Sequence, residues 1–293
     1  MSRITAIYLT LLGATCMSLV GLCIRLIESA DGFQILFYRS FSMSLLIMMV
    51  ICLRRKIFPK FFLNTLDIND LMMGTSLSFA FFSYVFAMLN TSVASTLLLL
   101  STSPIIAGII GWVWIGEKPI KTTWFSMIIS FIGILIMFND GLEIGRLLGN
   151  SLALLSALFF AFTLVLARRS KKQDVLGGTF LGAFFSFLYG LILAVIFGNG
   201  FTLSHYDFWL IIFMGFFTIG LGVALVTWAT PFLPAAEVSL LVLLESILGP
   251  LWVWFFVGER MTFSEILGGM IVLSAVILLI YSKHKKEKVL MKL

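Results

Sequence analysis

The sequence is short of charge and of the side chains that bind metals. Only 12% of its 293 residues are charged and 60% are hydrophobic, whereas soluble domains are about 25% charged. A water-soluble globule is therefore excluded. There are two histidines, His205 and His284, and no H-E-x-x-H or paired-cysteine spacing. These absences argue against a metal site or an intramembrane metalloprotease, and no cofactor is expected.

Cysteine is scarce as well. Cys16, Cys23 and Cys52 all fall in apolar runs, and the first two are two helical turns, roughly 10 Å, apart, too far for a disulfide. We interpret all three as small apolar packing residues. The sequence also lacks a G-x-x-x-x-G-K-[ST] phosphate-binding loop, so the chain is not expected to hydrolyse ATP.

Long apolar runs dominate what is present. A bilayer core about 30 Å thick needs roughly 20 apolar residues per helix, and the runs do not alternate as the strands of a β-barrel would. The predicted fold is all-α, a polytopic membrane protein with ten transmembrane helices. The first run is too long for a secretory signal and is expected to remain as span one. The ten spans are expected at residues 4–27, 33–53, 71–89, 93–115, 122–138, 149–167, 177–197, 208–230, 236–257 and 263–281.

The basic residues set the predicted orientation. With the N-terminus inside, the outer loops hold only Arg146 and Arg260, the spans hold Arg25 and Arg39, and the other sixteen of the twenty Lys and Arg lie in inner segments. This asymmetry predicts a multi-pass protein of the inner (plasma) membrane with both termini in the cytoplasm. The basic residues behind the net charge of +6 are then expected to lie next to anionic lipid of the bilayer, and the charge does not indicate a nucleic acid partner.

The two halves of the chain are weakly repeated. One constant shift along the sequence places Leu98-Leu99 on Leu240-Leu241, Trp112 on Trp254, and Gly116-Glu117 on Gly258-Glu259. Because five spans are an odd number, the halves must cross the membrane in opposite senses, as in carriers built from inverted repeats. The predicted organisation is a first repeat over residues 1–140, a second over 147–283 and a basic cytoplasmic tail over 284–293.

Several segments resemble a known family. STSPIIAGIIGWVWIGEKP (Ser101 to Pro119) and LLESILGPLWVWFFVGERMTFSEILGG (Leu243 to Gly269) are similar to the paired signature regions of the drug/metabolite transporter superfamily, EamA type, as are FYRSF at Phe37 to Phe41 and the RRSKK loop after span six. The resemblance implies a transporter of amino acids or other metabolites. One departure is that relatives often have Glu-Pro in span nine, where this chain has Glu245-Ser246.

Two charged residues within spans are the main candidates for binding or coupling. A charge at the bilayer centre costs about 2.5–3.5 kcal/mol on insertion scales, so each should face protein or a cavity. Glu245 lies about 13 Å into span nine and is interpreted as a coupling-proton site, the partner of a substrate cation, or a structural carboxylate. Arg39 lies about 9 Å into span two. Its planar fork suits a carboxylate or phosphate, and an outer-side structural lock is the alternative.

Other candidates are weaker. Arg25 and Glu28 are three residues apart on one helical face and are expected to form an outer ion pair or gate. The remaining candidates are helix breaks near the midplane at Pro104 and Pro250, the hydroxyls of Ser101 and Ser103, which either line a cavity or bond the carbonyls freed by proline, and Tyr84 and Trp228 as further cavity residues.

Together these features predict a secondary active transporter, not an enzyme, that moves a small, amino-acid-like or related zwitterionic solute by alternating access. Energy would come from a proton gradient or from exchange. The alternatives are a scaffold or accessory subunit that transports nothing, and a membrane protein that modifies or translocates lipid. The sequence leaves open which solute is carried, in which direction, and whether the chain forms a homodimer.

Overall fold

The computed structural model describes residues 1–56, 58–91, 93–137, 147–170, 172, 174–198, 200–258 and 263–290. Over these ranges the chain is helical and has no strand. Eight helices are long and apolar enough to cross a membrane. Two shorter apolar helices, Lys121–Ile136 and Ile266–Tyr281, bring the number to ten. The predicted all-α, polytopic membrane fold is confirmed.

Several spans consist of more than one helical segment, so the helices outnumber the spans. Two of these segments, η1 and η3, are π-helical, a form that often marks functional sites. The first half consists of α1 (Arg3–Ser18), α2 (Val20–Leu26), α3 (Gly32–Arg55), α4 (Pro59–Leu63), α5 (Ile68–Asn90), α6 (Val93–Leu100), α7 (Ser103–Ile110), η1 (Gly111–Ile115) and α8 (Lys121–Met137). The second consists of α9 (Leu147–Arg169), α10 (Leu176–Phe197), α11 (His205–Phe213), η3 (Met214–Leu221), α12 (Gly222–Ala229), η4 (Thr230–Phe232), α13 (Ala235–Val242), α14 (Leu244–Val257) and α15 (Phe263–Leu290).

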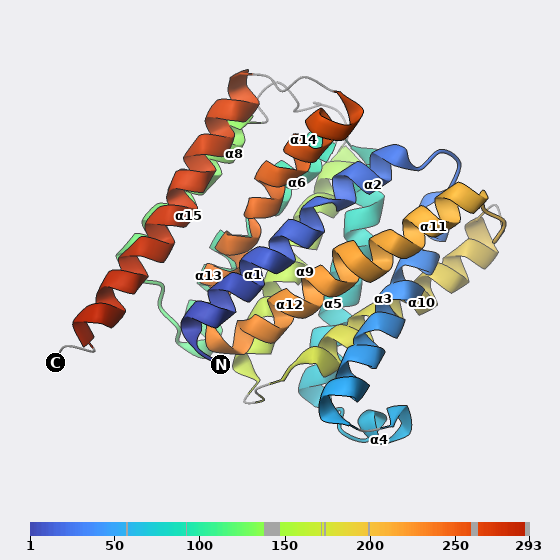
Figure 1. Ribbon diagram of the computed structural model, residues 1–293, viewed down its shortest axis with the longest axis horizontal. Coiled ribbons are helices and arrows are strands. Elements are labelled where there is room, and N and C mark those ends of the chain that lie inside the picture. Colours follow the sequence, from blue (N-terminus) through green and yellow to red (C-terminus); the bar gives the residue numbers. More distant parts are fainter. Residues whose placement is uncertain are drawn as a thin grey trace.

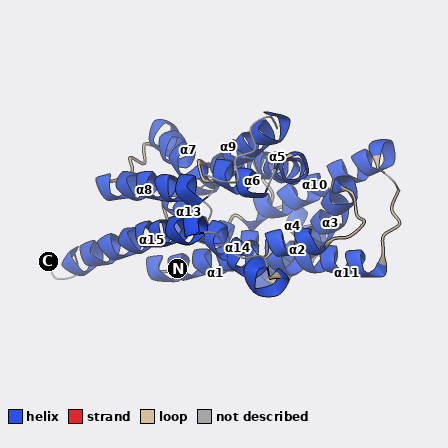
Figure 2. Cartoon of the chain, turned by 90° about the horizontal axis from the view of Figure 1, so that it is seen from above, coloured by secondary structure: helices blue, strands red, loops and turns tan. Residues whose placement is uncertain are grey.

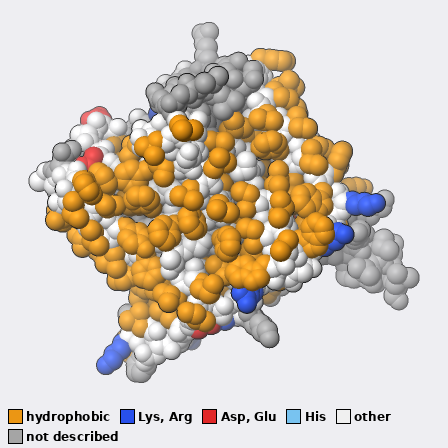
Figure 3. Space-filling view, turned by 180° about the vertical axis from the view of Figure 1, so that it is seen from behind, with side chains coloured by type: hydrophobic (Ala, Val, Ile, Leu, Met, Phe, Trp, Pro, Cys, Tyr) orange, Lys and Arg blue, Asp and Glu red, His pale blue; other side chains and the backbone are white. Residues whose placement is uncertain are grey.

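The surface is that of a protein solvated by lipid. Hydrophobic side chains cover the broad middle of the face in Figure 3, and the charged side chains drawn there lie toward its edges. Large apolar residues stand well exposed on many helices, among them Val195 and Phe255, the latter with 75% of its surface accessible. Apolar exposure on this scale is unfavourable in water and favourable in a bilayer.

The helices form a bundle with one separate pair at its edge. α5 packs along α9, and α10 packs against both α3 and α5. α8 and α15, spans five and ten, pack mainly on each other and lie side by side along one edge of the molecule in both Figure 1 and Figure 2. The other eight spans form the rest of the bundle.

Basic side chains collect at one end of the bundle. Contacts there link residues from both halves: Arg3 binds Glu237, and Arg168 binds Glu117. We call this end, which also carries Arg54, Arg55 and Lys172, the basic face, and the other end the opposite face. The N-terminus lies at the basic face (Figure 1).

The two halves end their fourth and ninth spans in the same way. Gly116 follows η1 and Gly258 follows α14, and each has a φ of 78°, the left-handed conformation that glycine adopts without strain. These glycines are a pair that the constant shift between the halves superimposes. The equivalent pair Glu117 and Glu259 cannot be compared, because Glu259 lies outside the described residues.

Spans four and nine are both interrupted, but a proline marks only one of the two breaks. In span four the helix stops after Leu100 and restarts at Ser103, with Pro104 in the new first turn. In span nine the break is at Leu243, whose amide bonds to the Leu240 carbonyl three residues back. The prediction that Pro250 marks this break is wrong, since Pro250 lies inside α14. The change of hydrogen-bond register alone ends α13.

Span eight approaches span two too closely for a side chain at Gly215. A Cβ there would lie 2.2 Å from the Arg39 carbonyl oxygen, and backbone cannot move aside as a flexible side chain can. Gly215→Ala is therefore expected to destabilise the protein by about 1–3 kcal/mol, as overpacking does, measured as a lower melting temperature in detergent. Gly21→Ala is the control, because nothing lies within 4 Å of a Cβ at that position. Equal melting temperatures for the two variants would contradict the close contact.

Candidate functional site

A cavity lies at the centre of the bundle, at the level of the two helix breaks. Its volume is about 80 Å³, well above the roughly 15 Å³ that a single water molecule needs. Spans one, two, three, four, six, eight and nine contribute to its wall. The wall is mostly apolar with a few converging polar groups, which is the usual composition of a small-molecule site. We call this space the central cavity.

Arg39 brings an uncompensated positive charge to the central cavity. It lies on α3 and is only 1% exposed. Neither Nη1 nor Nη2 has a hydrogen-bond partner among the described residues. The guanidinium carbon lies 5.5 Å from the centre of the Phe81 ring, a cation–π distance. A buried cation without an anionic partner is costly, so this site is suited to a bound anionic group.

Glu245 brings a carboxylate to the same cavity. It lies in the first turn of α14, directly after the break at Leu243, where the free amides of a helix start favour negative charge. No hydrogen bond or ion pair joins its carboxylate to another residue of the described ranges. Tyr84 from α5 interacts electrostatically with both Glu245 and Arg39. The cavity therefore presents an acid, a phenol and a base in one apolar enclosure.

A second cavity lies nearer the basic face, with a volume of about 270 Å³. Its wall includes Ala107 from α7 and Ala236 from α13, about one helical turn from Ser103 and Ser239 of the central cavity. The two serine hydroxyls are buried and hydrogen bond to each other across 2.9 Å. This contact joins small residues of spans four and nine on the wall of the central cavity, close in sequence to residues on the wall of the second cavity. We call the second space the basic-face cavity.

The structure brings five of the six predicted binding residues to the wall of the central cavity: Arg39, Tyr84, Ser101, Ser103 and Glu245. The Ser101 hydroxyl bonds the Leu98 carbonyl, so it also serves the interrupted backbone.

Trp228 does not line the central cavity. Its ring is covered by the Arg54 guanidinium, 3.8 Å from the ring centre, toward the basic face. Arg25 and Glu28 lie exposed at the opposite face and are not part of the wall either. The backbone amide of Glu28 donates to Asp207 of α11 at 3.0 Å.

Sequence reasoning missed several wall residues. Ser239 and Ser246 are single hydroxyls in apolar runs, with nothing in their spacing to set them apart from packing serines. Phe81 and Phe160 are two of thirty phenylalanines in the chain. The repeat did offer a signal for Ser246, because the constant shift between the halves pairs it with Pro104, which was a candidate.

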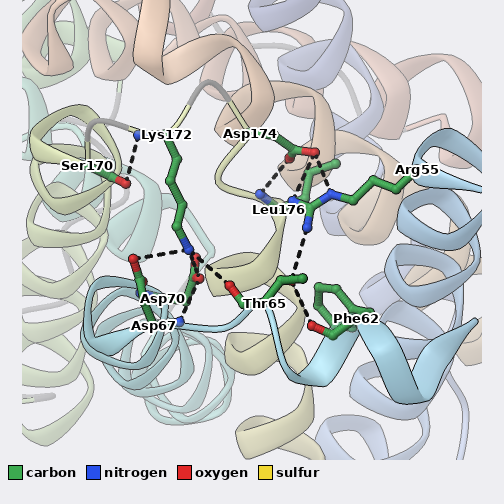
Figure 4. Close-up of polar contacts among 9 residues, drawn as sticks. All are labelled: Arg55, Phe62, Thr65, Asp67, Asp70, Ser170, Lys172, Asp174 and Leu176. Atoms are coloured by element: carbon green, nitrogen blue, oxygen red, sulfur yellow. Dashed lines mark hydrogen bonds and ion pairs between the residues drawn. The ribbon is translucent and has the colours of Figure 1, made fainter. Parts of the chain in front are cut away.

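Figure 4 shows how charged groups connect the halves at the basic face. Arg55 at the end of α3 contacts Asp174, which precedes α10, at 3.2 Å. Lys172, between α9 and α10, reaches Asp70 and Asp67 at the start of α5. Burial lowers the pKa of Lys172, but its hydrogen bonds to Asp70 and Asp67 outweigh this and hold its pKa above the usual 10.5. A raised lysine pKa stabilises the fold below pH 10.5 and stops doing so only as the pH rises through the folded value.

No group of three or more potential metal ligands occurs among the residues that the structure describes. The acidic side chains of the basic face form ion pairs with arginine and lysine.

The family model for the EamA-like transporter family matches the chain twice, over residues 4–139 and 147–281. The chain belongs to the EamA-like transporter family. This EamA-like transporter is also 24% identical to a protein of Archaeoglobus fulgidus described as an uncharacterized transporter, over 203 residues that make up 67% of this chain and 70% of that one. A solved crystal structure superimposes with a TM-score of 0.78 at 14% identity, covering 94% of this chain and 97% of the other. That likeness shows the fold alone.

The family and the relative establish a multi-pass membrane transporter. Members of the EamA-like family are transporters and not enzymes, which agrees with the prediction that this chain is not an enzyme. The transporter class of this EamA-like transporter, and the small-molecule cargo that the class implies, thus rest on the family.

Proposed function

We propose that this EamA-like transporter is a secondary active carrier of a small zwitterionic metabolite, with Arg39 binding the carboxylate of the solute and Glu245 binding its amine or a coupling proton. The observation that carries the proposal is the pair of opposite charges in one cavity, neither of them joined by an ion pair to a residue of the described ranges. A ligand with both charges would neutralise both.

The broken helices support an anionic group near the centre. α7 and α14 both begin at the central cavity, and Ser103 and Glu245 lie in their first turns. A helix start carries a partial positive charge, and carriers commonly bind substrate where interrupted helices meet near the midplane. The dipole of α7, which has no acidic residue in its first turn, adds to the charge of Arg39.

The proposed mechanism is alternating access between the two faces of the membrane. We propose that the Ser103–Ser239 contact closes the central cavity toward the basic face and that the basic-face cavity is the vestibule into which it opens; the hydrogen bond between the two serines and the nearby wall of the basic-face cavity support this. We propose that the protein lies in the cell membrane with its basic face, and therefore its N-terminus, on the cytoplasmic side, because the positive-inside rule favours basic residues on that side.

Two measurements test the proposed solute class. Untargeted metabolite profiles of cells with and without the protein, taken inside and outside the cells, should differ in compounds that carry both an acidic and a basic group. The same compounds should raise the melting temperature of the purified protein, whereas their esters and N-acyl derivatives, which lack one charge, should not. If only uncharged compounds or lipids stabilise the protein, the proposal is wrong, and equal profiles would favour a scaffold.

A further inference from the structure

Two aspartates hold the halves together at opposite faces of the membrane, and they occupy equivalent places in the repeat. Asp70 is the third residue of α5, which begins span three, and Asp207 is the third residue of α11, which begins span eight. Both are buried, with 4% and 0% of their surface accessible. Spans three and eight are the third spans of their respective halves, so the inverted repeat relates these two positions.

Each carboxylate binds the first connecting segment of the other half. Asp70, in the first half, accepts a hydrogen bond from Lys172, in the segment between spans six and seven. Asp207, in the second half, accepts from the Glu28 amide at 3.0 Å and from the Ser29 amide and hydroxyl at 2.9 and 2.6 Å, in the segment between spans one and two. These two segments are themselves equivalent in the repeat. The same bridge is thus built twice, once at the basic face and once at the opposite face.

The local chain geometry repeats with the bridges. A capping side chain precedes each aspartate by three residues: Asp67 accepts from the Asp70 amide at 2.9 Å, and Ser204 accepts from the Asp207 amide at 3.0 Å. Capping fixes the backbone of the first turn, so the carboxylate at the third position is held toward the neighbouring segment. The constant shift between the halves does not reveal this pair, because it places Asp70 on Ile212.

We infer that Asp70 and Asp207 are paired positioning residues of the transport cycle, each holding its own face of the protein closed. The inference rests on the proposed alternating access. In this inference the two halves part at the basic face when it opens, so that the segment between spans six and seven leaves span three and the Asp70–Lys172 contact breaks together with the Ser103–Ser239 contact. Opening toward the opposite face requires the segment between spans one and two to leave span eight, which breaks the contacts of Asp207. Both sets of contacts are made in this structure.

The chemistry of the two bridges differs, and the difference can be tested. The bridge at the basic face is an ion pair that lysine completes, whereas the bridge at the opposite face uses backbone amides and one hydroxyl. Replacing Lys172 by glutamine therefore weakens the first bridge without changing the capping of α5. The second bridge has no such charged partner, and only Asp207 or Ser29 can be altered.

The experiment measures access to the central cavity from each side. A single reporter, Ser246→Cys, is placed in a chain whose three native cysteines are replaced by alanine, and membrane vesicles of each orientation receive a membrane-impermeant maleimide. Cysteine at the exposed position Lys60 identifies the vesicles that present the basic face. Asp70→Asn and Lys172→Gln should each raise the rate of labelling from the basic face at least about 3-fold, and Asp207→Asn should do so from the opposite face.

The control is Ser274→Ala in span ten, which removes a hydroxyl that bonds the Ile271 carbonyl of its own helix and takes part in neither bridge, and it should not shift the labelling toward either side. If the parent reporter is labelled from both sides but the aspartate and lysine variants do not change the ratio, the inference is wrong and the proposed transport cycle stands. If the parent reporter is labelled from one side under every condition, alternating access itself fails. Because Lys172→Gln leaves the buried aspartate in place, a folding defect in Asp70→Asn does not remove the test.

Discussion

Glu245→Gln is expected to lower gradient-driven transport by at least about 100-fold. Glutamine matches glutamate in size but cannot release or accept the coupling proton, and it cannot neutralise an ammonium group in the apolar central cavity. The measurement is uptake of the identified solute into proteoliposomes under an imposed pH gradient. The Glu245 carboxylate, in the first turn of α14, makes no hydrogen bond or ion pair to any other described residue. A loss of transport in this variant is therefore not expected to come from misfolding.

The control for this variant is Glu28→Gln, which neutralises an exposed carboxylate that is not on the cavity wall and keeps the backbone amide that donates to Asp207. It should transport at the parent rate. Solute exchange at equal pH separates the two roles of Glu245: exchange that survives in Glu245→Gln indicates proton coupling, whereas loss of exchange as well indicates a direct contact with the solute. Unchanged gradient-driven uptake would contradict both roles.

A disulfide between positions 103 and 239 is expected to stop transport almost completely. The Ser103 and Ser239 hydroxyls are 2.9 Å apart, so the corresponding cysteine sulfurs can come within bonding distance with little backbone movement. The bond would fix span four against span nine between the two cavities. With Ser103→Cys and Ser239→Cys in a chain lacking the native cysteines, oxidation should lower uptake at least about 10-fold, and reduction should restore it.

Each single cysteine variant serves as the control, since neither can form the disulfide, and the oxidant should not change uptake by either one. Formation of the bond is measured separately by blocking free thiols with a reagent that changes the mass. A protein that is fully cross-linked and still transports would show that the Ser103–Ser239 contact does not open during the cycle, and the route through the basic-face cavity would have to be abandoned.

Most of the fold could be predicted from the composition of the sequence and from its internal repeat. Ten apolar runs and an odd number of spans per half were sufficient to predict an all-helical membrane protein with inverted halves. The pairing of Gly116 with Gly258, found by a simple shift, corresponds to two helix ends of the same conformation. The charge argument also located the cavity, because Arg39 and Glu245 are the charged residues that apolar spans tolerate only in protected surroundings.

Details that depend on contacts between distant segments could not be predicted in the same way. The break at Leu243 involves no proline or glycine and arises from a backbone register change within a leucine-rich run. Trp228 packs under the guanidinium of Arg54, a residue of another span, toward the basic face. The bridge from Lys172 to Asp70 joins two distant parts of the chain, and in the sequence both belong to stretches rich in polar residues.

The pairing of α8 with α15 has a consequence for synthesis of the protein. A chain made on the ribosome releases its N-terminal part first, so the fifth helix enters the bilayer long before its main partner, the tenth, has been translated. Until then its inward face, which carries Thr123, Ser126 and Ser130 and is buried in the finished protein, is open to lipid. Nascent chains that stop before residue 263 should therefore expose a polar stripe that membrane quality-control proteases can recognise.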